Sequence, residues 1–206
     1  REIINLLRVK DWLKNLIIFF PLVFSGLLSV YSNYSYLLIG FFYFSIVSSV
    51  VYIINDILDI EADKLHPTKK FSKPLAAGTI TLNFAYILLF IVLIILSSSF
   101  FIMPSIIYSL FFYFLISLIY NFYFKKIPFI ELIIISLGYV IRVDAGSNLI
   151  NLDSSFSMII ATFFLAMFFL TIKRLSELNQ PEINHNLTRK VLAFYKTKYL
   201  KISALI

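Results

Sequence analysis

Long apolar runs separated by short polar stretches dominate this chain. A transmembrane helix needs about 20 predominantly apolar residues, and six runs reach or approach that length: residues 15–31, 36–55, 80–97, 101–123, 128–147 and 156–172. A seventh begins near Val191 and continues to Ile206. The first run is not a cleavable signal, because it lacks an A-x-A-like site and further spans follow at once. The pattern predicts an all-α fold, a polytopic transmembrane bundle forming a single domain over 1–206.

The composition supports a membrane protein. Hydrophobic residues make up 60% of the 206 residues, aromatic residues 18%, and the mean hydropathy is +0.91. The absence of cysteine excludes disulfides and thiolate metal sites. Because the chain starts with Arg1 and stops inside an apolar run, we interpret it as a fragment that is truncated at its C-terminus.

The basic residues are distributed unevenly between the connections. They precede the first run, lie between the second and third and between the fourth and fifth, and follow the sixth; the alternate connections "YSNYS" and "SSSFFIMPS" have none, and Arg142 is the single exception. By the positive-inside rule this predicts a cytoplasmic N-terminus. The net charge of +7 therefore reflects topology, and we expect no nucleic-acid partner.

An acidic and basic stretch, "NDILDIEADKLHPTKKFSKP" at 55–74, interrupts the apolar pattern. Asp56, Asp59 and Asp63 share one face if the second helix continues until just before Pro67, and Asn55 adds a neutral oxygen beside them. Mg²⁺ prefers one or two carboxylates together with phosphate oxygens, so the cluster suggests a metal shared with a diphosphate. The alternative is a solvated loop of salt bridges. In either case the partners are the nearby lysines, as phosphate ligands or as counter-ions: Lys64, Lys69, Lys70 and Lys73.

The motif "NDILDIEAD" resembles the NDxxDxxxD signature of the UbiA-type intramembrane prenyltransferase superfamily, at the cytoplasmic end of helix 2. Within it the chain is similar to the decaprenyl-phosphate phosphoribosyltransferases, through "DWLKN", "DIEADKLHPTKKFSKPLAAG", "GYVIRVDAG", "IKRLSEL" and "RKVLAFYKTKYL". The resemblance implies a Mg²⁺-dependent enzyme of the bacterial plasma membrane with a cytoplasmic active site. It also implies about nine helices, of which this chain would hold about seven, and a homo-oligomer is possible.

The same resemblance implies the substrates. The donor would be phosphoribosyl diphosphate and the acceptor a polyprenyl phosphate, with Asp56 and Asp59 as catalytic metal ligands supported by Asp63. Aromatic-ring prenyltransferases of the superfamily usually have a second aspartate-rich motif after helix 6. This chain instead has Lys173, Arg174 and Glu177, which suits a second phosphate, because Lys and Arg bind anions directly. The alternative is a basic helix cap paired with Glu177 at i,i+3 or i,i+4.

Three further positions keep two interpretations each. Lys14 and Asn15 are phosphate contacts by resemblance, or an interfacial anchor beside Trp12. Glu131 either orients a lysine or a ribose hydroxyl, or pairs with Lys125 or Lys126.

Arg142 lies about 21 Å into its helix at 1.5 Å per residue. An intramembrane arginine is a candidate for substrate binding, or a structural tie to another helix. The following Asp144 leaves a local charge pair possible. Neither His66 nor His185 is assigned a metal.

Two other functions remain open at this point. One is an aromatic or quinone polyprenyltransferase that uses a prenyl diphosphate. The other is a cation channel or transporter, although no acidic path crosses the apolar runs.

Overall fold

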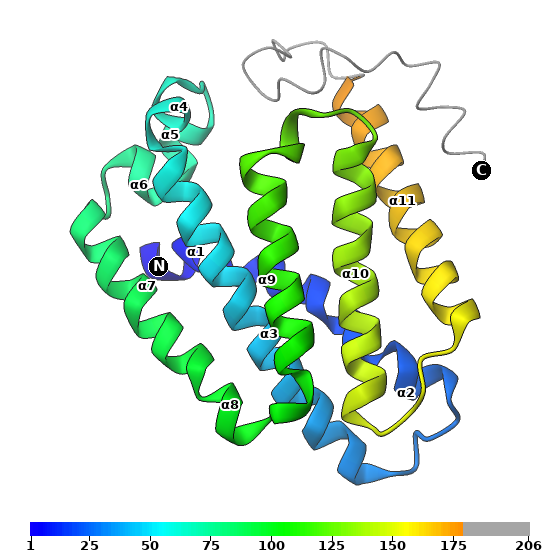
Figure 1. Ribbon diagram of the computed structural model, residues 1–206. Coiled ribbons are helices and arrows are strands. Elements are labelled where there is room, and N and C mark those ends of the chain that lie inside the picture. Colours follow the sequence, from blue (N-terminus) through cyan, green and yellow to red (C-terminus); the bar gives the residue numbers. More distant parts are fainter. Residues whose placement is uncertain (179–206) are drawn as a thin grey trace.

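A computed structural model describes residues 1–178, and helices are the only regular secondary structure in this range. Figure 1 shows the long helices packed side by side as a bundle, each running between the same two poles of the molecule. The elements are α1 (Glu2–Leu6), the 3₁₀-helix η1 (Val9–Phe19), α2 (Phe20–Phe24), α3 (Tyr31–Leu58), α4 (Ile60–Leu65), α5 (Lys69–Ser72), α6 (Pro74–Ala77), α7 (Leu82–Ser97), α8 (Ser99–Ile102), η2 (Pro104–Ile106), α9 (Ile107–Phe122), η3 (Phe124–Lys126), α10 (Ile130–Leu149) and α11 (Phe156–Leu178).

Four helical segments of the described chain are long and apolar enough to cross a membrane: Tyr31–Leu58, Leu82–Ile102, Pro104–Phe122 and Phe156–Leu178. They correspond to four of the predicted runs. α10 has 20 residues and also matches its predicted run, but it contains Glu131, Arg142 and Asp144. It packs against α9 and α11 (Figure 1). The predicted all-α membrane bundle is confirmed, and the seventh run lies outside the described residues.

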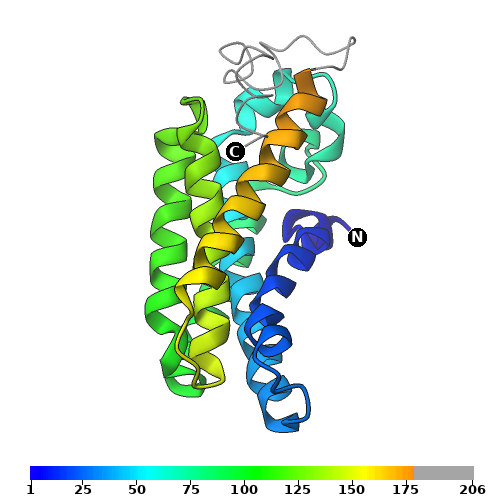
Figure 2. The ribbon, with the colours of Figure 1, turned by 90° about the vertical axis from the view of Figure 1, so that its right-hand side faces the viewer.

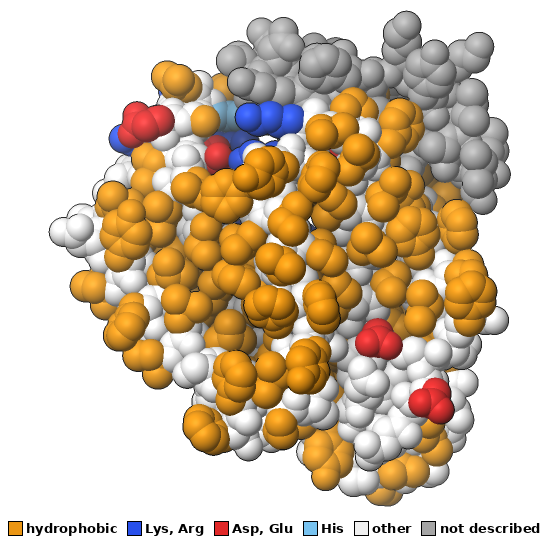
Figure 3. All heavy atoms as spheres, viewed as in Figure 1, with side chains coloured by type: hydrophobic (Ala, Val, Ile, Leu, Met, Phe, Trp, Pro, Cys, Tyr) orange, Lys and Arg blue, Asp and Glu red, His pale blue; other side chains and the backbone are white. Residues whose placement is uncertain are grey.

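α3 is the central helix of the bundle. Its most apolar window is 67% buried, whereas the windows of the other three spans are each 17% buried. A core joins α3 to α9, α10 and the amino-terminal segment through residues such as Phe44, Val47, Leu110 and Leu149. The apolar side chains on the outside cover most of the flank in Figure 3 and suit contact with lipid.

The first predicted span is the part of the fold that the sequence pattern described incorrectly. Residues 15–31 do not form one α-helix; the segment is the 3₁₀-helix η1, then α2 with Pro21 in its first turn. Proline cannot donate the backbone hydrogen bond that would continue an α-helix through this point. Tertiary contacts hold the segment instead, since Trp12 Nε1 donates to Ser49 Oγ at 3.0 Å. Figure 2 shows this segment along one face of the bundle.

A glycine permits the close approach of η1 to α10. A Cβ atom placed on Gly146 would lie 2.1 Å from the backbone carbonyl oxygen of Ile18. No side chain fits there, because the obstruction is backbone and cannot rotate away. The close contact between η1 and α10 therefore requires glycine at 146.

The polar loop between α3 and α7 forms three short helices at one pole of the bundle. α6 begins with Pro74 and is capped at its carboxyl end by Gly78, whose φ of 73° is left-handed, the usual arrangement at helix ends. α4, α5 and η3 lie at the same pole as the carboxyl end of α11 (Figure 1). Basic side chains gather near α4 and α5 in Figure 3.

Candidate active site

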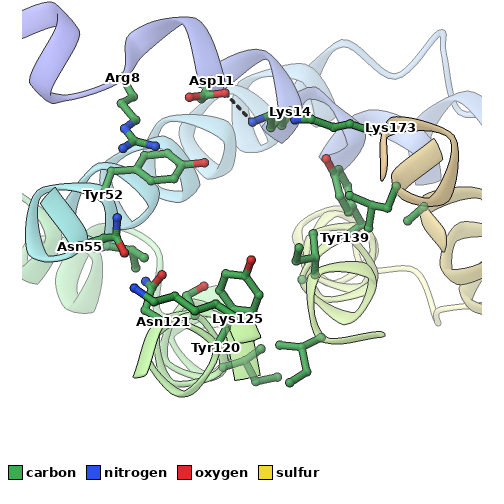
Figure 4. Close-up of a pocket in the computed structure, with 18 of the residues that line it drawn as sticks. Arg8, Asp11, Lys14, Tyr52, Asn55, Tyr120, Asn121, Lys125, Tyr139 and Lys173 are labelled. Atoms are coloured by element: carbon green, nitrogen blue, oxygen red, sulfur yellow. Dashed lines mark hydrogen bonds and ion pairs between the residues drawn. The ribbon is translucent and has the colours of Figure 1, made fainter. Parts of the chain in front are cut away.

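A cavity of about 1040 Å³ lies between η1, α3, α9, α10 and α11. Apolar side chains of α10 and α11, among them Ile134, Leu165 and Phe169, line one part of it. Tyrosine and asparagine side chains and the charged groups of several elements surround the rest (Figure 4). The charged residues are Arg8, Asp11, Lys14, Asp59, Asp63, Lys69, Lys73, Lys125, Lys126, Lys173, Arg174 and Arg142. This cavity can hold an apolar chain and several anionic groups together.

Two of the three predicted aspartates form one buried charge cluster. Asp56 accepts from Arg8 Nη2 at 2.6 Å and from Lys73 Nζ at 2.8 Å. The same Lys73 ammonium donates to Asp63 at 2.5 Å, and Lys69 lies 3.4 Å from Asp63. Both carboxylates are buried, so the surrounding cations compensate their loss of hydration.

Asp59 points to a different partner, which corrects the expectation of one continuous helix face. α3 ends at Leu58, and Asp59, with φ −97° and ψ 7°, separates it from α4. Both of its carboxylate oxygens accept from Lys125 Nζ, at 3.0 and 3.1 Å. Asp59 therefore pairs with Lys125 of η3, while Asp56 and Asp63 share Lys73.

The three aspartates do not converge on a preformed metal site. Within residues 1–178, no three Asp, Glu, His or Cys side chains are grouped closely enough to hold a metal ion, and Lys73 lies between Asp56 and Asp63. Asn55, Asp59 and Asp63 nevertheless line the cavity. Mg²⁺ needs only one or two protein carboxylates when phosphate oxygens and water complete its shell, so this oxygen donor set fits a metal shared with a diphosphate.

The basic loop divides into residues that face the cavity and residues that do not. Lys69 and Lys73 line it. Lys64 is exposed and pairs with Glu61 at 2.8 Å, and Lys70 lies over the Phe71 ring at 4.7 Å. The expectation that Lys64 and Lys70 bind substrate is therefore not supported by their positions, because neither lines the described cavity.

His66 holds this loop in shape. Its Nδ1 accepts from the backbone amides of Thr68 and Lys69, at 3.2 and 3.3 Å. Burial lowers the pKa of His66 below its usual value, and Lys69 and Lys73 lower it further against the opposing effect of Asp63. A neutral ring keeps the lone pair that accepts these bonds.

Arg174 and Glu177 form the structural alternative considered for the "KRLSE" stretch. Arg174 donates to Glu131 through Nε at 2.7 Å and Nη2 at 3.1 Å, and to Glu177 through Nη1 at 2.9 Å. The predicted pairing of Glu131 with Lys125 or Lys126 is replaced by this link between α10 and α11. Lys173, one residue earlier, lines the cavity and extends toward it in Figure 4.

Arg142 and Asn15 also form a tie between helices. Arg142 donates to Asn15 Oδ1 at 2.7 Å, Gly138 O at 2.7 Å and Tyr113 OH at 2.8 Å, and its guanidinium lies 4.3 Å from the centre of the Tyr113 ring. Asp144 accepts from Ser154 and Asn148 instead. Arg142 still lines the cavity, whereas Asn15 is buried behind it.

Several cavity residues were not singled out from sequence. Arg8, Tyr52, Asn121 and Tyr139 surround the cavity in Figure 4. Only the left-handed backbone of Arg8 distinguishes it locally, and one sequence cannot reveal that. Lys14, which was predicted, lines the cavity and pairs with Asp11.

A bundle whose intramembrane cavity joins an apolar wall to a charged pole is typical of an enzyme that works on a lipid and a polar substrate. This chain belongs to the UbiA prenyltransferase family, whose model matches residues 18–190. It is therefore a transferase and an integral membrane protein.

Curated relatives are similar over nearly the whole chain. The decaprenyl-phosphate phosphoribosyltransferase of Mycobacterium tuberculosis is 31% identical over 209 residues, which cover 97% of this chain and 67% of the relative. The enzyme of the same name from Corynebacterium glutamicum is 28% identical, with 96% and 61% covered. The chain thus spans about two thirds of the length of these relatives.

A solved structure has the same fold. A UbiA homolog from Archaeoglobus fulgidus, bound to DMAPP and Mg²⁺, matches with a TM-score of 0.77 and 19% identity, covering 100% of this chain and 73% of that chain.

Proposed function

We propose that this protein transfers the 5-phosphoribosyl group of phosphoribosyl diphosphate to a polyprenyl phosphate at the cytoplasmic face of the membrane, releasing diphosphate. The observation that carries the proposal is that two sides of one cavity differ. Asn55, Asp59 and Asp63 line the side called acidic here, where lysines pair with both carboxylates. Lys14, paired with Asp11, and Lys173 line the side called cationic, across the cavity from Asn55 in Figure 4. Two phosphorylated substrates need both. The names of the mycobacterial and corynebacterial relatives support the same substrates.

The acidic side would bind the leaving group. Asn55, Asp59 and Asp63 would hold Mg²⁺, which supplies charge neutralisation for the departing diphosphate. Lys125 and Lys69, now paired with these carboxylates, lie where their ammonium groups can turn to the phosphate oxygens. Lysine suits this task because its flexible stem carries three rotatable donors.

The cationic side would hold the nucleophile. Lys14 and Lys173 would bind the lipid phosphate, and the apolar wall of α10 and α11 would accommodate the first part of the prenyl chain. An oxygen of the lipid phosphate then bonds to C1 of the ribose, while the bond from C1 to the diphosphate breaks and its electron pair leaves with the diphosphate. Catalysis would come from positioning and charge stabilisation, because a phosphate monoester is already anionic.

Four buried polar residues would position the helices that line the cavity and would not bind substrate themselves: Arg174, Glu131, Arg142 and Asn15. Their hydrogen bonds join α10 to α11 and to η1, so they set the distance between the two sides of the cavity. We expect their substitution to affect stability together with activity.

The test is a transfer assay with the purified full-length protein in detergent, Mg²⁺ and radiolabelled phosphoribosyl diphosphate. We expect label in the butanol phase only when polyprenyl phosphate is present, and none after chelation of the metal. Turnover of a prenyl diphosphate with an aromatic acid, combined with no transfer from the sugar donor, would establish the aromatic prenyltransferase alternative instead.

A further inference from the structure

A second recess of about 370 Å³ adjoins the main cavity, between the amino-terminal segment and α5–α6. Six charged residues line the recess. Two of them, Asp56 and Lys10, do not line the main cavity, whereas Arg8, Asp11, Lys69 and Lys73 line both spaces. Four cationic side chains thus face two carboxylates, and Oδ1 of Asp56 is already paired with both Arg8 and Lys73. The excess of positive charge makes the recess suitable for an anion.

Arg8 is fixed in place at the boundary between the two spaces. Its guanidinium lies 4.6 Å from the centre of the Tyr52 ring, and Nη2 donates to the buried Asp56 at 2.6 Å. Among the described residues Nε and Nη1 have no hydrogen-bond partner. A guanidinium held by stacking and by one edge can offer its remaining donors to a phosphate with little loss of side-chain entropy.

The backbone at Arg8 supports a functional role. Arg8 lies in the break between α1 and η1 with φ 51° and ψ 47°, a left-handed conformation that residues other than glycine seldom adopt. Such strain persists where the surrounding structure requires a particular side-chain position. Here the conformation accompanies the placement of the guanidinium over Tyr52.

We propose that this recess binds the 5-phosphate of the sugar donor, with Arg8 and Lys10 as its ligands; this rests on the proposed function. The donor has phosphate groups at two ends, and the diphosphate end is assigned to Asn55 and Asp59 on the other side of Arg8. The lipid phosphate fits the recess less well, because the apolar wall that would hold its chain belongs to α10 and α11.

The assignment gives the recess a role in specificity. A prenyl diphosphate has no phosphate group apart from its diphosphate, so Arg8 would contribute binding energy only to a phosphorylated sugar. This binding energy would come from charge-assisted hydrogen bonds between the guanidinium and the phosphate, which are roughly twice as strong as neutral hydrogen bonds.

The experiment combines protein variants with a shortened donor in the full-length enzyme. Initial rates are measured with phosphoribosyl diphosphate and with ribosyl 1-diphosphate, which lacks the 5-phosphate, and inhibition by ribose 5-phosphate gives a direct binding readout. Arg8→Gln is compared with Arg1→Gln, a matched change in the same segment that lines neither cavity. Lys10→Gln changes an exposed side chain and so keeps the fold.

We expect Arg8→Gln to raise KM for phosphoribosyl diphosphate and Ki for ribose 5-phosphate by about ten- to a hundredfold. KM for polyprenyl phosphate and the rate with the shortened donor should change by less than about threefold, which is below 1 kcal/mol. Lys10→Gln should show the same selective loss to a smaller degree, and Arg1→Gln should behave as wild type.

Equal losses with both donors would mean that Arg8 acts only by holding Asp56, and would overturn the inference while the proposed function stands. A selective rise in KM for polyprenyl phosphate would assign the recess to the lipid head group and would also overturn it. If the wild type transfers no sugar, the proposed function and this inference fail together.

Discussion

Substitution of the neighbouring residues Lys173 and Arg174 should affect different properties: activity for Lys173 and stability for Arg174. Arg174 is 1% exposed and its main partner Glu131 is 0% exposed, with two hydrogen bonds of 2.7 and 3.1 Å between them. In Arg174→Gln the carboxylate of Glu131 loses its buried counter-ion. Removing one partner of a buried ion pair typically costs about 3–5 kcal/mol, because the other charge stays buried and uncompensated.

Lys173→Gln removes a charge that lines the cavity and leaves this ion pair intact. We expect it to change the free energy of unfolding by less than about 0.5 kcal/mol, the range of surface substitutions, and to lower transfer to polyprenyl phosphate by about tenfold or more. It is the matched control for Arg174→Gln, since both place glutamine at adjacent positions of α11.

The assay is unfolding by titration with sodium dodecyl sulfate in mixed micelles, followed by circular dichroism, with transfer rates measured on the folded fraction. The double variant Glu131→Gln with Arg174→Gln should recover part of the stability, because two amides can hydrogen-bond without a buried charge. The reasoning is refuted if Arg174→Gln is as stable as wild type and loses only activity, because Arg174 would then bind substrate directly.

Three further predictions concern the site and its scaffold. Asp59→Asn should cost more than about 2 kcal/mol of transition-state stabilisation, a loss of about 30-fold in kcat/KM, with unfolding unchanged; near-normal kinetics would remove the metal assignment. Gly146→Ala should destabilise the fold by about 1–3 kcal/mol or more, since the added Cβ meets the Ile18 carbonyl, and a wild-type unfolding curve would contradict the close contact. His66→Ala should cost about 1 kcal/mol by freeing two backbone amides, whereas His66→Asn supplies another acceptor and should lose less; equal losses in both would exclude the capping role.

The helices of the bundle follow from local sequence, with the first as the exception. Runs such as 156–172 are apolar enough to require burial or lipid wherever they lie, and their length matches a membrane. The first run has similar apolarity, but Pro21 and the contact of Ile18 with Gly146 determine its form. The proline in this run is visible in the sequence, whereas the contact of Ile18 with a glycine about 130 residues later is not.

The sequence predicted the types of charged residue that line the candidate site, but only part of their spatial arrangement. The motif at 55–63 correctly located acidic groups at a cavity, and Lys14, Lys69, Lys73 and Lys173 line the same space. Asp59 pairs with Lys125 while Asp56 and Asp63 share Lys73, and the sequence could not predict this choice of partners, because Lys125 lies 66 residues from Asp59 in the chain. Arg8 was missed, since its importance depends on Tyr52 and Asp56, which lie more than 40 residues away in the chain.

The sequence by itself determined that this protein spans a membrane as helices and concentrates charge at one pole. Each side chain's preference for lipid or water depends on that side chain alone, so hydropathy and charge can be read directly from the sequence. Only the tertiary structure decided which charges neutralise one another and which face the cavity. A buried ion pair such as Arg174 with Glu131 forms where two helices bring side chains together, and that distance is set by packing far along the chain rather than by either residue's neighbours.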